Sequence, residues 1–316
     1  MDVSIIIVNW NTRARLRNCI KSIIENAGPI EYEIIVVDNA STDASVEMVK
    51  DRFPSVVVIA NDDNRGFASA NNQGIEVAMG RYVLLLNSDT LVGESAIAKT
   101  VTYADKNPEA AVVGCQVWKD METIQMTCFR FTNLFNLMLR ETGLATFFRN
   151  NRILGSQWMH WWKRDTEKQV DVVSGMYMLV RSTAIDHVGP MDESFYMYYE
   201  ETDWCYRFHK AGWKSLFYPG AKIIHIHGGG SSSNKVRSKM FVQFQKSLLI
   251  FLKKHNGSLA AFAARLILIT SFTVRTLVWL AIMTLHKILN REISSHKQQV
   301  HMNLAALRFS LIGIEI

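Results

Sequence analysis

The sequence has few of the residues that mark disulfide-rich or metal-stabilised domains. Only four of its 316 residues are cysteine, and these form neither a CxxC pair nor a spacing typical of metal ligands. This argues against a disulfide scaffold and against a zinc module, and it is consistent with a reducing cytosol. The first apolar run covers only residues 3–8 and no basic residue precedes it, so we do not expect a signal peptide.

Acidic residues are scarce in two segments of the chain. Residues 246–316 carry a net charge of +7 and residues 129–164 carry +5, which leaves −6 for the remainder of a chain whose total is +6. Both segments are also rich in large apolar side chains. An anionic membrane surface favours basic charge and apolar area together, so we expect a membrane surface and no nucleic acid as partner. Ordinary surface charge over core residues is the alternative.

Apolar runs alternate with helical stretches in the first half of the chain. The runs at 3–8, 33–37, 56–60 and 82–86 are typical of strands buried on both faces, and helices are expected over about 13–26, 43–52 and 67–79. Further strands are expected near 111–117, 170–180 and 222–226, and a helix near 200–211. This order predicts an α/β fold with a mostly parallel sheet and ligands at the carboxyl ends of its strands.

We expect two domains. The first, residues 1–245, comprises a nucleotide-binding half (1–110) and an acceptor and catalytic half (111–245), which includes the basic, aromatic segment 129–164. The second, residues 246–316, is expected to be helical, basic and apolar and to associate with a membrane.

Polar residues follow three of the predicted strands. Asn9 and Asn11 follow the first, Asp38 the second, and Asn87 and Asp89 the fourth. A carboxylate at Asp38 can accept hydrogen bonds from a base or ribose, or it can serve as a turn or helix-cap acid. Asp89 stands where a divalent cation can bridge a diphosphate, and carboxylates suit Mg²⁺ or Mn²⁺. No GxGxxG follows the first strand, which argues against a nicotinamide-dependent oxidoreductase.

Several segments resemble a known enzyme family. VSIIIVNWN (3–11), VDNASTD (37–43), NRGFASANNQG (64–74) and LNSD (86–89) resemble the family 2 glycosyltransferases in sequence and order. SGMYMLVR (174–181), FYMYYEETDWCYR (195–207) and AKIIH (221–225) are similar to the bacterial rhamnosyltransferase branch, which assembles O-antigen and cell-wall polysaccharide. The resemblance covers about residues 1–235. It implies a GT-A-type fold, a sugar-nucleotide donor, a divalent metal ion (Mn²⁺ or Mg²⁺) and inversion at the anomeric carbon.

The resemblance also implies the roles of single residues. Its donor site comprises Asn9, Asn11, Asp38, Arg65, Asn71, Asn87 and Asp89. Asp38 would bind the base or ribose and Asp89 the metal, while Asn87 stands where many members carry a second acid. His225 matches a position that supplies a further metal or diphosphate contact; the alternative is a histidine that only closes a strand. Arg65 can pair with phosphate or remain a solvated loop residue.

The catalytic base is expected among Glu200, Glu201 and Asp203. Inversion is a single displacement in which the acceptor hydroxyl must lose its proton, and a carboxylate within hydrogen-bond reach can take it. The resemblance places the base at Glu201, where related sequences usually have Asp. Because Glu is one methylene longer, Asp203 stays as an alternative, and one of the three acids is expected only to complement the dipole of its helix.

Aromatic residues in the segment 129–164 suggest how the acceptor is received. Trp158, Trp161 and Trp162, together with Trp204, are expected to contact lipid headgroups and a polyprenyl-diphosphate-linked acceptor, because indole is favourable at membrane interfaces. The alternative is a helical insert whose aromatic side chains form core.

The C-terminal region contains the longest apolar stretch. Residues 259–285 are interrupted by Arg265 and Arg275, whereas a spanning helix needs ~20 residues with few charges. Both arginines fall in one sector of a helix, which favours a helix that lies in the membrane interface. A spanning helix and a buried helix of a homodimer are the alternatives. The expected location is the cytoplasmic face of the bacterial inner membrane, as a peripheral or monotopic protein.

Together these features predict an inverting, metal-dependent glycosyltransferase of cell-surface polysaccharide biosynthesis. It would move L-rhamnose from dTDP-rhamnose to a hydroxyl of a polyprenyl-diphosphate-linked saccharide. A UDP-hexose or UDP-N-acetylhexosamine donor is one alternative, because thymine and uracil present the same hydrogen-bonding edge. A catalytically silent scaffold that binds nucleotide sugars is another.

Overall fold

The computed structural model describes residues 1–119, 122–226, 234–289, 292 and 294–312. The chain forms two compact units. The first unit comprises Met1–Phe131 and Gln157–Gly228, and the second comprises Thr132–Ser156 and Gly229–Ile316. This division differs from the expected one, because residues 132–156 of the basic, aromatic segment and residues 229–245 both group with the C-terminal helices.

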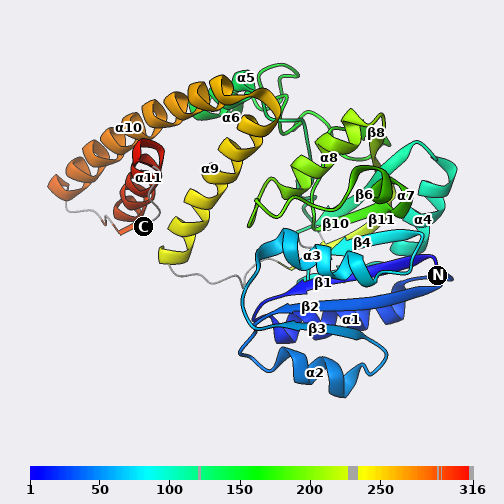
Figure 1. The fold of residues 1–316 in the computed structure, drawn as a ribbon. Coiled ribbons are helices and arrows are strands. Elements are labelled where there is room, and N and C mark those ends of the chain that lie inside the picture. Colours follow the sequence, from blue (N-terminus) through cyan, green and yellow to red (C-terminus); the bar gives the residue numbers. More distant parts are fainter. Residues whose placement is uncertain (120–121, 227–233, 290–291, 293, 313–316) are drawn as a thin grey trace. The chain divides into compact units, whose positions relative to one another are not determined.

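A nine-stranded sheet forms the centre of the first unit (Figure 1). Its order is β3-β2-β1-β4-β10-β6-β11-β5, and β8 pairs with β11. The strands are β1 (Val3–Asn9), β2 (Tyr32–Asn39), β3 (Val57–Asn61), β4 (Tyr82–Leu86), β5 (Thr90–Val92), β6 (Ala110–Trp118), β8 (Lys168–Val170), β10 (Tyr177–Arg181) and β11 (Lys214–His225). Strands β3, β2, β1 and β4 are parallel, as are β6 and β11, whereas β10 and β5 are antiparallel to their neighbours. The predicted α/β fold with a mostly parallel sheet is confirmed.

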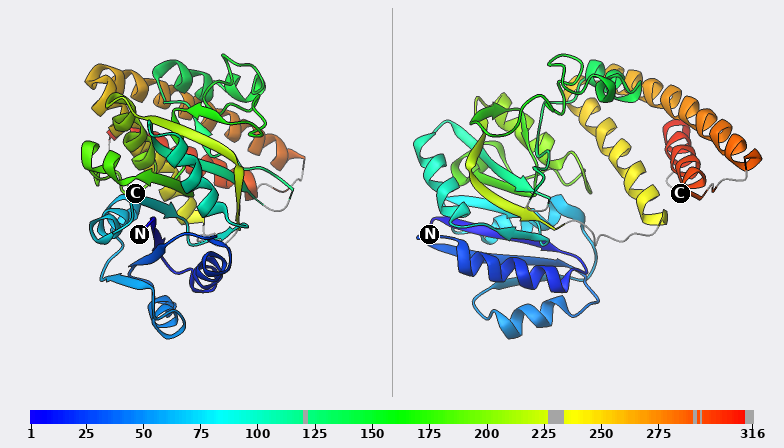
Figure 2. Two further views of the ribbon diagram at one scale, coloured as in Figure 1. Left: turned by 90° about the vertical axis from the view of Figure 1, so that its right-hand side faces the viewer. Right: turned by 180° about the vertical axis from the view of Figure 1, so that it is seen from behind.

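Helices cover both faces of this sheet (Figures 1 and 2). They are α1 (Arg13–Asn26), α2 (Ser45–Arg52), α3 (Gly66–Val77), α4 (Ala96–Lys106), α7 (Ser182–Val188) and α8 (Glu200–Lys210). Side chains of α1, α2 and α4 enter one apolar core, and those of α3, α7 and α8 enter the other. Along β1, Ile5 and Ile7 belong to the first core and Ile6 to the second, because successive strand residues point to opposite faces. A short ribbon of β7 (Cys128–Phe129) and β9 (Val172–Val173) lies beside the second core.

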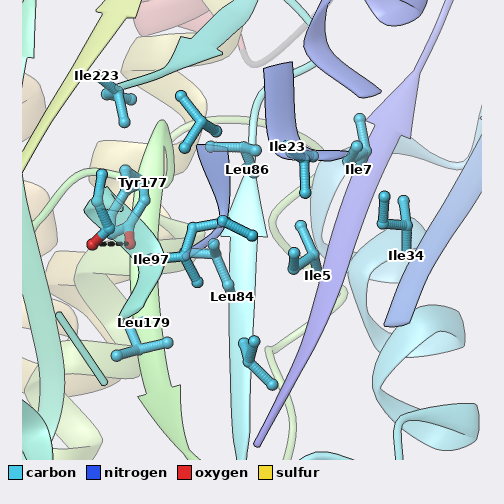
Figure 3. Close-up of a cluster of buried hydrophobic side chains, with 14 of the residues drawn as sticks. Ile5, Ile7, Ile23, Ile34, Leu84, Leu86, Ile97, Tyr177, Leu179 and Ile223 are labelled. Carbon is cyan, nitrogen blue, oxygen red and sulfur yellow. Dashed lines mark hydrogen bonds between the residues drawn. The ribbon is translucent and has the colours of Figure 1, made fainter. Parts of the chain in front are cut away.

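The core beneath α1 and α4 fixes the register of the strands (Figure 3). Ile5 of β1 packs there with Ile23 of α1 and Ile97 of α4. Tyr177 of β10 reaches the same core, and its hydroxyl shares a 2.6 Å hydrogen bond with that of Thr100. Full burial of an apolar side chain such as that of Ile5 stabilises the fold by about 1.5–3 kcal/mol. The packing of this core therefore holds the ends of β1, β2 and β4 in place.

The second unit is helical. It consists of α5 (Leu134–Glu141), α6 (Leu144–Phe147), α9 (Asn234–Asn256), α10 (Ser258–Ile288) and α11 (Ser294–Ile312), with α10 in contact with α5, α9 and α11. Glu141 is buried, and its carboxylate accepts a 2.9 Å hydrogen bond from Ser271 and lies 3.2 Å from a guanidinium nitrogen of Arg275. Arg140 completes the network at 3.0 Å. These contacts attach α5 to α10.

Helix α10 is long and apolar. By length and composition it is the one candidate for crossing a membrane among the helices that the structure describes, and only 17% of its most apolar 18-residue window is buried inside the protein. The exposed positions between Ser258 and Leu285 carry no charged side chain. A large uncharged face of this helix is therefore left open.

Candidate active site

The ends of β1 and β2 bring Asn9 and Asp38 together. The parallel register sets the two residues opposite each other, and the Asn9 side-chain amide donates a 2.7 Å hydrogen bond to the Asp38 carboxylate. The backbone N–H of Ser41 donates to the other Asp38 oxygen at 2.8 Å. Asp38 thus shapes the turn after β2, the alternative that the sequence left open. Asp38 is 1% exposed, so its binding of a base or ribose stays a prediction.

Asn11 braces the loop after β1 against the loop after β2. Its backbone lies in the left-handed region, with φ of 53°, and its side-chain oxygen accepts a 2.8 Å hydrogen bond from the N–H of Thr42. Its own N–H donates to the Ser41 hydroxyl at 2.8 Å. Non-glycine residues in this conformation cost free energy and often occur at functional sites.

A chain of hydrogen bonds joins these loops to the end of β4. The Thr12 hydroxyl donates to the side-chain oxygen of Asn9 at 2.5 Å, and it also shares a 2.8 Å hydrogen bond with the Ser88 hydroxyl. Ser88 immediately precedes Asp89 in the sequence. The chain therefore links Asp38 with the segment that contains Asp89. The sequence analysis singled out neither hydroxyl, although both lie in the strand-end segments that it identified.

Asp89 and His225 are adjacent in space. β5 begins directly after Asp89 and pairs antiparallel with the end of β11, so that His225 lies opposite Thr90. The Nε2 atom of His225 is 3.0 Å from a carboxylate oxygen of Asp89, and the side chains are 8% and 24% exposed. On its other side, Nδ1 of His225 lies 3.1 Å from the Gln125 side-chain oxygen. In the tautomer that donates Nδ1–H to Gln125, Nε2 would be the nitrogen able to ligate a cation beside Asp89.

The side chains of Asp89 and His225 fit a cation that a bound diphosphate also holds. Among the described residues no group of three or more His, Cys, Asp and Glu could hold a metal ion. Asp89 and His225 alone supply one carboxylate and one imidazole. A diphosphate and water complete such a shell for Mg²⁺ or Mn²⁺, and the imidazole favours Mn²⁺.

Asn87, Arg65 and Asn71 have different surroundings. The Asn87 carbonyl accepts a 2.8 Å hydrogen bond from the Thr90 hydroxyl, which shapes the turn before β5. Arg65 is exposed and pairs with Asp63 at 3.2 Å. Asn71 is buried in α3 and donates a 2.8 Å hydrogen bond to the carbonyl of Phe67. The contacts of Asn71 lie within the helix, so a role in donor binding stays a prediction.

Glu200 and Glu201 open α8 after a strained turn. Tyr198 and Tyr199 have φ of 66° and 69°, which turns the chain sharply into the helix. One carboxylate oxygen of each glutamate is buried without a hydrogen-bond partner in the described part of the chain. Burial raises the pKa of both carboxyl groups, and the charge of Glu201 raises the pKa of Glu200 further. Buried acids with raised pKa values are typical of proton-transfer sites.

Asp203 has a structural partner. Its side chain is fully buried and lies 2.8 Å from Nε of Arg207, one helical turn later. The same guanidinium donates hydrogen bonds to the carbonyls of Val188 and Pro190. Asp203 therefore holds Arg207, which fixes α8 to the segment before it; the choice of Glu201 as base stays a prediction.

One loop connects the glutamates with the end of β4. Helix α8 contacts β9, and the residues after β9 lead into β10. In this loop the carbonyl of Met176 accepts a 3.2 Å hydrogen bond from the N–H of Asn87. A Cβ atom at Gly66, at the start of α3, would lie 2.3 Å from the carbonyl oxygen of Tyr196. Glycine is thus required where α3 meets the segment that precedes Glu200.

The model of glycosyl transferase family 2 matches residues 4–164. The chain belongs to this family. The predicted family is confirmed.

Curated relatives of this glycosyltransferase are named as sugar transferases. It is 24% identical over 239 residues to the N-acetylglucosaminyl-diphospho-decaprenol L-rhamnosyltransferase of Mycobacterium tuberculosis, an alignment that covers 71% of this chain and 76% of the relative. It is 30% identical over 168 residues to the poly(ribitol-phosphate) beta-glucosyltransferase of Bacillus spizizenii, covering 48% of this chain and 26% of the relative.

Solved structures share the fold of this glycosyltransferase. Mannosyltransferase PcManGT from Pyrobaculum calidifontis, in complex with GDP-Man and Mn²⁺, aligns over 99% of this chain and 88% of its own, with a TM-score of 0.54 and 16% identity. GalNAc-T7 with UDP, GalNAc and Mn²⁺ aligns over 81% of this chain at a TM-score of 0.55 and 16% identity. This chain spans about half, 51%, of the length of GalNAc-T7.

Two of the four tryptophans assigned to acceptor or membrane contact are in the core of the glycosyltransferase. Trp204 is fully buried, and its indole N–H donates a 2.9 Å hydrogen bond to the carbonyl of Gly189. Trp162 is 6% exposed and packs edge-on against Phe217. Both assignments are wrong, because neither ring reaches the surface. Trp158 and Trp161 are half-buried, and their role stays a prediction.

Arg164 was expected in the basic segment that faces a membrane, and it is buried instead. It is 1% exposed, and its guanidinium donates hydrogen bonds to the carbonyls of Trp158 and Trp162 at 2.9 and 2.8 Å. These hydrogen bonds from the charged guanidinium fix the conformation of the segment that precedes β8. Gln125, like Thr12 and Ser88, is not identified from the sequence, since its segment matches no motif.

Proposed function

We propose that this glycosyltransferase moves a sugar, with inversion, from a nucleotide-diphosphate donor to a hydroxyl of a polyprenyl-diphosphate-linked saccharide. The observation that carries the proposal is the hydrogen-bond chain from Asp38 through Asn9 and Thr12 to Ser88, next to the Asp89–His225 pair. It supports the proposal because it joins Asp38, the proposed nucleoside ligand, to the segment of Asp89, the proposed cation ligand. The first relative supports the acceptor, since its name specifies a sugar linked to decaprenyl diphosphate.

Asp89 and His225 would hold the divalent cation. A cation bound there supplies positive charge that offsets the negative charge growing on the departing diphosphate. Gln125 would orient His225 for this purpose, and Asp38 would fix the turn after β2 against which the nucleoside is held. Mn²⁺ is favoured over Mg²⁺ because one of the two ligands is an imidazole.

Glu201 would accept the proton of the acceptor hydroxyl. The oxygen of that hydroxyl forms the new bond to the anomeric carbon as the bond to the diphosphate breaks, and the proton passes to the carboxylate. Burial raises the pKa of both carboxyl groups, and the charge of Glu201 raises that of Glu200 further. In this proposal Glu200 carries the proton of the pair and Glu201 acts as the ionised base.

The proposed donor is dTDP-L-rhamnose, by analogy with the rhamnosyltransferase relative. A UDP-hexose or UDP-N-acetylhexosamine is the alternative, and the UDP in the GalNAc-T7 structure favours it. We further propose that the second unit attaches the enzyme to the anionic cytoplasmic face of the bacterial inner membrane. A homodimer that covers α10 is the alternative for its open face.

A panel of sugar nucleotides tests the reaction. The full chain is incubated with dTDP-rhamnose, UDP-glucose and UDP-N-acetylglucosamine, each with Mn²⁺, Mg²⁺ or EDTA, and release of nucleoside diphosphate is measured. Hydrolysis that requires a divalent cation and is fastest with dTDP-rhamnose supports the proposal. Faster hydrolysis of a UDP-sugar than of dTDP-rhamnose would mean that the donor is a UDP-sugar. Binding of nucleotide without any turnover, also with lipid-linked acceptor, indicates the silent scaffold.

A further inference from the structure

The second unit is strongly basic. Its two segments, Thr132–Ser156 and Gly229–Ile316, contain fifteen Lys and Arg and three Glu, a net charge of +12, whereas the first unit, with twenty basic and twenty-six acidic residues, carries −6. One of the three glutamates is Glu141, which is buried between Arg140 and Arg275. The surface of this unit therefore attracts anions with little competition from its own carboxylates.

A cavity of about 420 Å³ lies within this unit, lined by α9, α10 and Phe309 of α11. Three of its lining side chains are cationic: Lys246 and Lys253 of α9, and Arg265 of α10. No Asp or Glu lines it in the described part of the chain. The three cations lie on two helices that pack together, so they surround one space.

The rest of the cavity wall is apolar. Leu249 of α9, Phe262 of α10 and Phe309 of α11 contribute to it. Phe262 also belongs to the open face of α10, where it is 58% exposed, and Leu266, one turn later, is 48% exposed. The cavity thus continues, through Phe262, into an uncharged helix face on which a hydrocarbon chain can lie.

We propose that this cavity binds the phosphate headgroup of a long-chain lipid. The phosphate is held by Lys246, Lys253 and Arg265, and the hydrocarbon chain leaves along Phe262 and Leu266. Charge and apolar surface are both needed for this ligand, and the cavity supplies both. A free anion would use only the cations, and a second copy of this basic unit would bring like charges together. The site shares no residue with the candidate active site, and its occupancy does not depend on the transfer reaction.

Binding of the full chain to vesicles tests the proposal. One set of vesicles contains phosphatidylcholine with phosphatidylglycerol, a second contains phosphatidylcholine with a few per cent of undecaprenyl phosphate, and a third contains phosphatidylcholine alone. Preferential binding to the first or the second set is expected, and the comparison between them tells whether a bilayer phospholipid or a polyprenyl phosphate is the occupant. Equal binding to all three sets overturns the proposal.

Two variants test the cavity itself. Lys253→Gln with Arg265→Gln is expected to weaken binding to the anionic vesicles by about 30-fold, the effect of two charges near the phosphate. Ala261→Trp changes no charge but fills the cavity, which Ala261 lines, and is expected to weaken binding by about tenfold. The matched controls are Lys254→Gln with Lys297→Gln, and Ala281→Trp on the exposed face of α10.

The controls are expected to lower binding by less than about threefold. If they weaken binding as much as the cavity variants do, the attraction comes from the whole basic surface and the site is wrong. If inorganic phosphate at millimolar concentration displaces the protein from vesicles as well as a short-chain lipid phosphate does, the apolar wall takes no part and the proposal is overturned. Circular dichroism of each variant identifies any that fails to fold, and the remaining cavity variant then decides.

Discussion

Glu201 and Asp203 are two positions apart in the sequence, but the fold gives them different surroundings. Asp203 is neutralised by Arg207 at 2.8 Å, which in turn binds two carbonyl groups. Glu201 keeps one carboxylate oxygen without a hydrogen-bond partner among the described residues. The motif alone could not separate the two acids, because both lie in the first turn of the same helix. The pair of Asp203 with Arg207 supports the proposal that Glu201 is the base.

Glu201→Gln is expected to lower turnover by ~10²–10⁴, because the amide cannot accept the proton of the acceptor hydroxyl. Binding of the donor nucleotide should change little, and calorimetric titration with nucleoside diphosphate and Mn²⁺ checks it. Asp203→Asn serves as the matched control and should lower the free energy of unfolding by about 1–3 kcal/mol through the loss of the pair with Arg207. A fully active Glu201→Gln variant beside an inactive but folded Asp203→Asn variant would reverse the assignment.

The pH dependence of turnover should reflect the ionisation of Glu200 and Glu201. Burial raises the pKa of Glu201, and the base must be ionised to act, so turnover should rise with pH through a limb above the usual range of glutamate. Glu200→Gln mimics the neutral form of Glu200 and should keep this limb. The residual activity of Glu201→Gln should lack it. Rates with saturating donor between pH 5 and pH 9 make the comparison, and a limb that persists in Glu201→Gln contradicts the role of Glu201.

At the scale of elements, β5 and the end of β11 form the frame of the cation pair. Their antiparallel pairing sets His225 opposite Thr90, directly after Asp89. Gln125 holds the imidazole from the other side, and its side-chain amide in turn donates to the sulfur of Met176 at 3.3 Å. The pair is thus oriented by a residue on a separate segment.

Gln125→Leu should weaken the binding of Mn²⁺, in the presence of nucleoside diphosphate, by about tenfold, because the partner that orients a histidine ligand is lost. Titration with Mn²⁺ followed by electron paramagnetic resonance measures this effect. Gln169→Leu, at an exposed position of β8, is the control and should bind Mn²⁺ as the unaltered protein does. Unchanged affinity in Gln125→Leu would remove His225 from the proposed ligand set.

A second frame lies between α5 and α10, where Glu141 meets Arg275 and Ser271. Glu141→Gln should lower the stability of the second unit by about 1–3 kcal/mol, because two arginines lose a buried carboxylate. Thermal unfolding followed by circular dichroism at 222 nm gives the measurement. Glu292→Gln, at an exposed position of the same unit, should have no effect beyond about 0.5 kcal/mol. An equal loss in both variants would mean that Glu141 does not hold the helices together.

The elements that the sequence predicted are those with a local signal. The buried strands β1, β2 and β4 read as continuous apolar runs, and the residues at their ends could therefore be placed at one edge. β5 and β8 are three residues long and have no such signal. The contact of Glu141 with Arg275 joins residues 134 positions apart, so no local pattern could assign residues 132–156 to the helical unit. Trp204 and Trp162 were misassigned because composition does not tell a buried indole from an exposed one.

At the scale of the whole molecule, charge and apolar surface are unevenly shared. The basic unit also contains α10, whose open face carries Leu266 and Leu277 at 48% and 61% exposure. Large exposed apolar patches on a soluble protein mark an interaction site. Because basic charge accompanies the patch, we propose that an anionic bilayer covers it and not a second copy of the same unit.

Leu266→Asp with Leu277→Asp should therefore move the full chain from the membrane fraction to the soluble fraction after cell lysis. Each aspartate placed in the bilayer costs up to ~3 kcal/mol, and neither position is buried in the protein. Metal-dependent hydrolysis of the donor should not change, since both residues lie outside the first unit. Ile24→Asp, at an exposed apolar position of α1, is the matched control and should remain with the membranes. A double variant that still sediments with membranes, but elutes at half the mass of the unaltered protein in detergent, would show that α10 joins two copies instead.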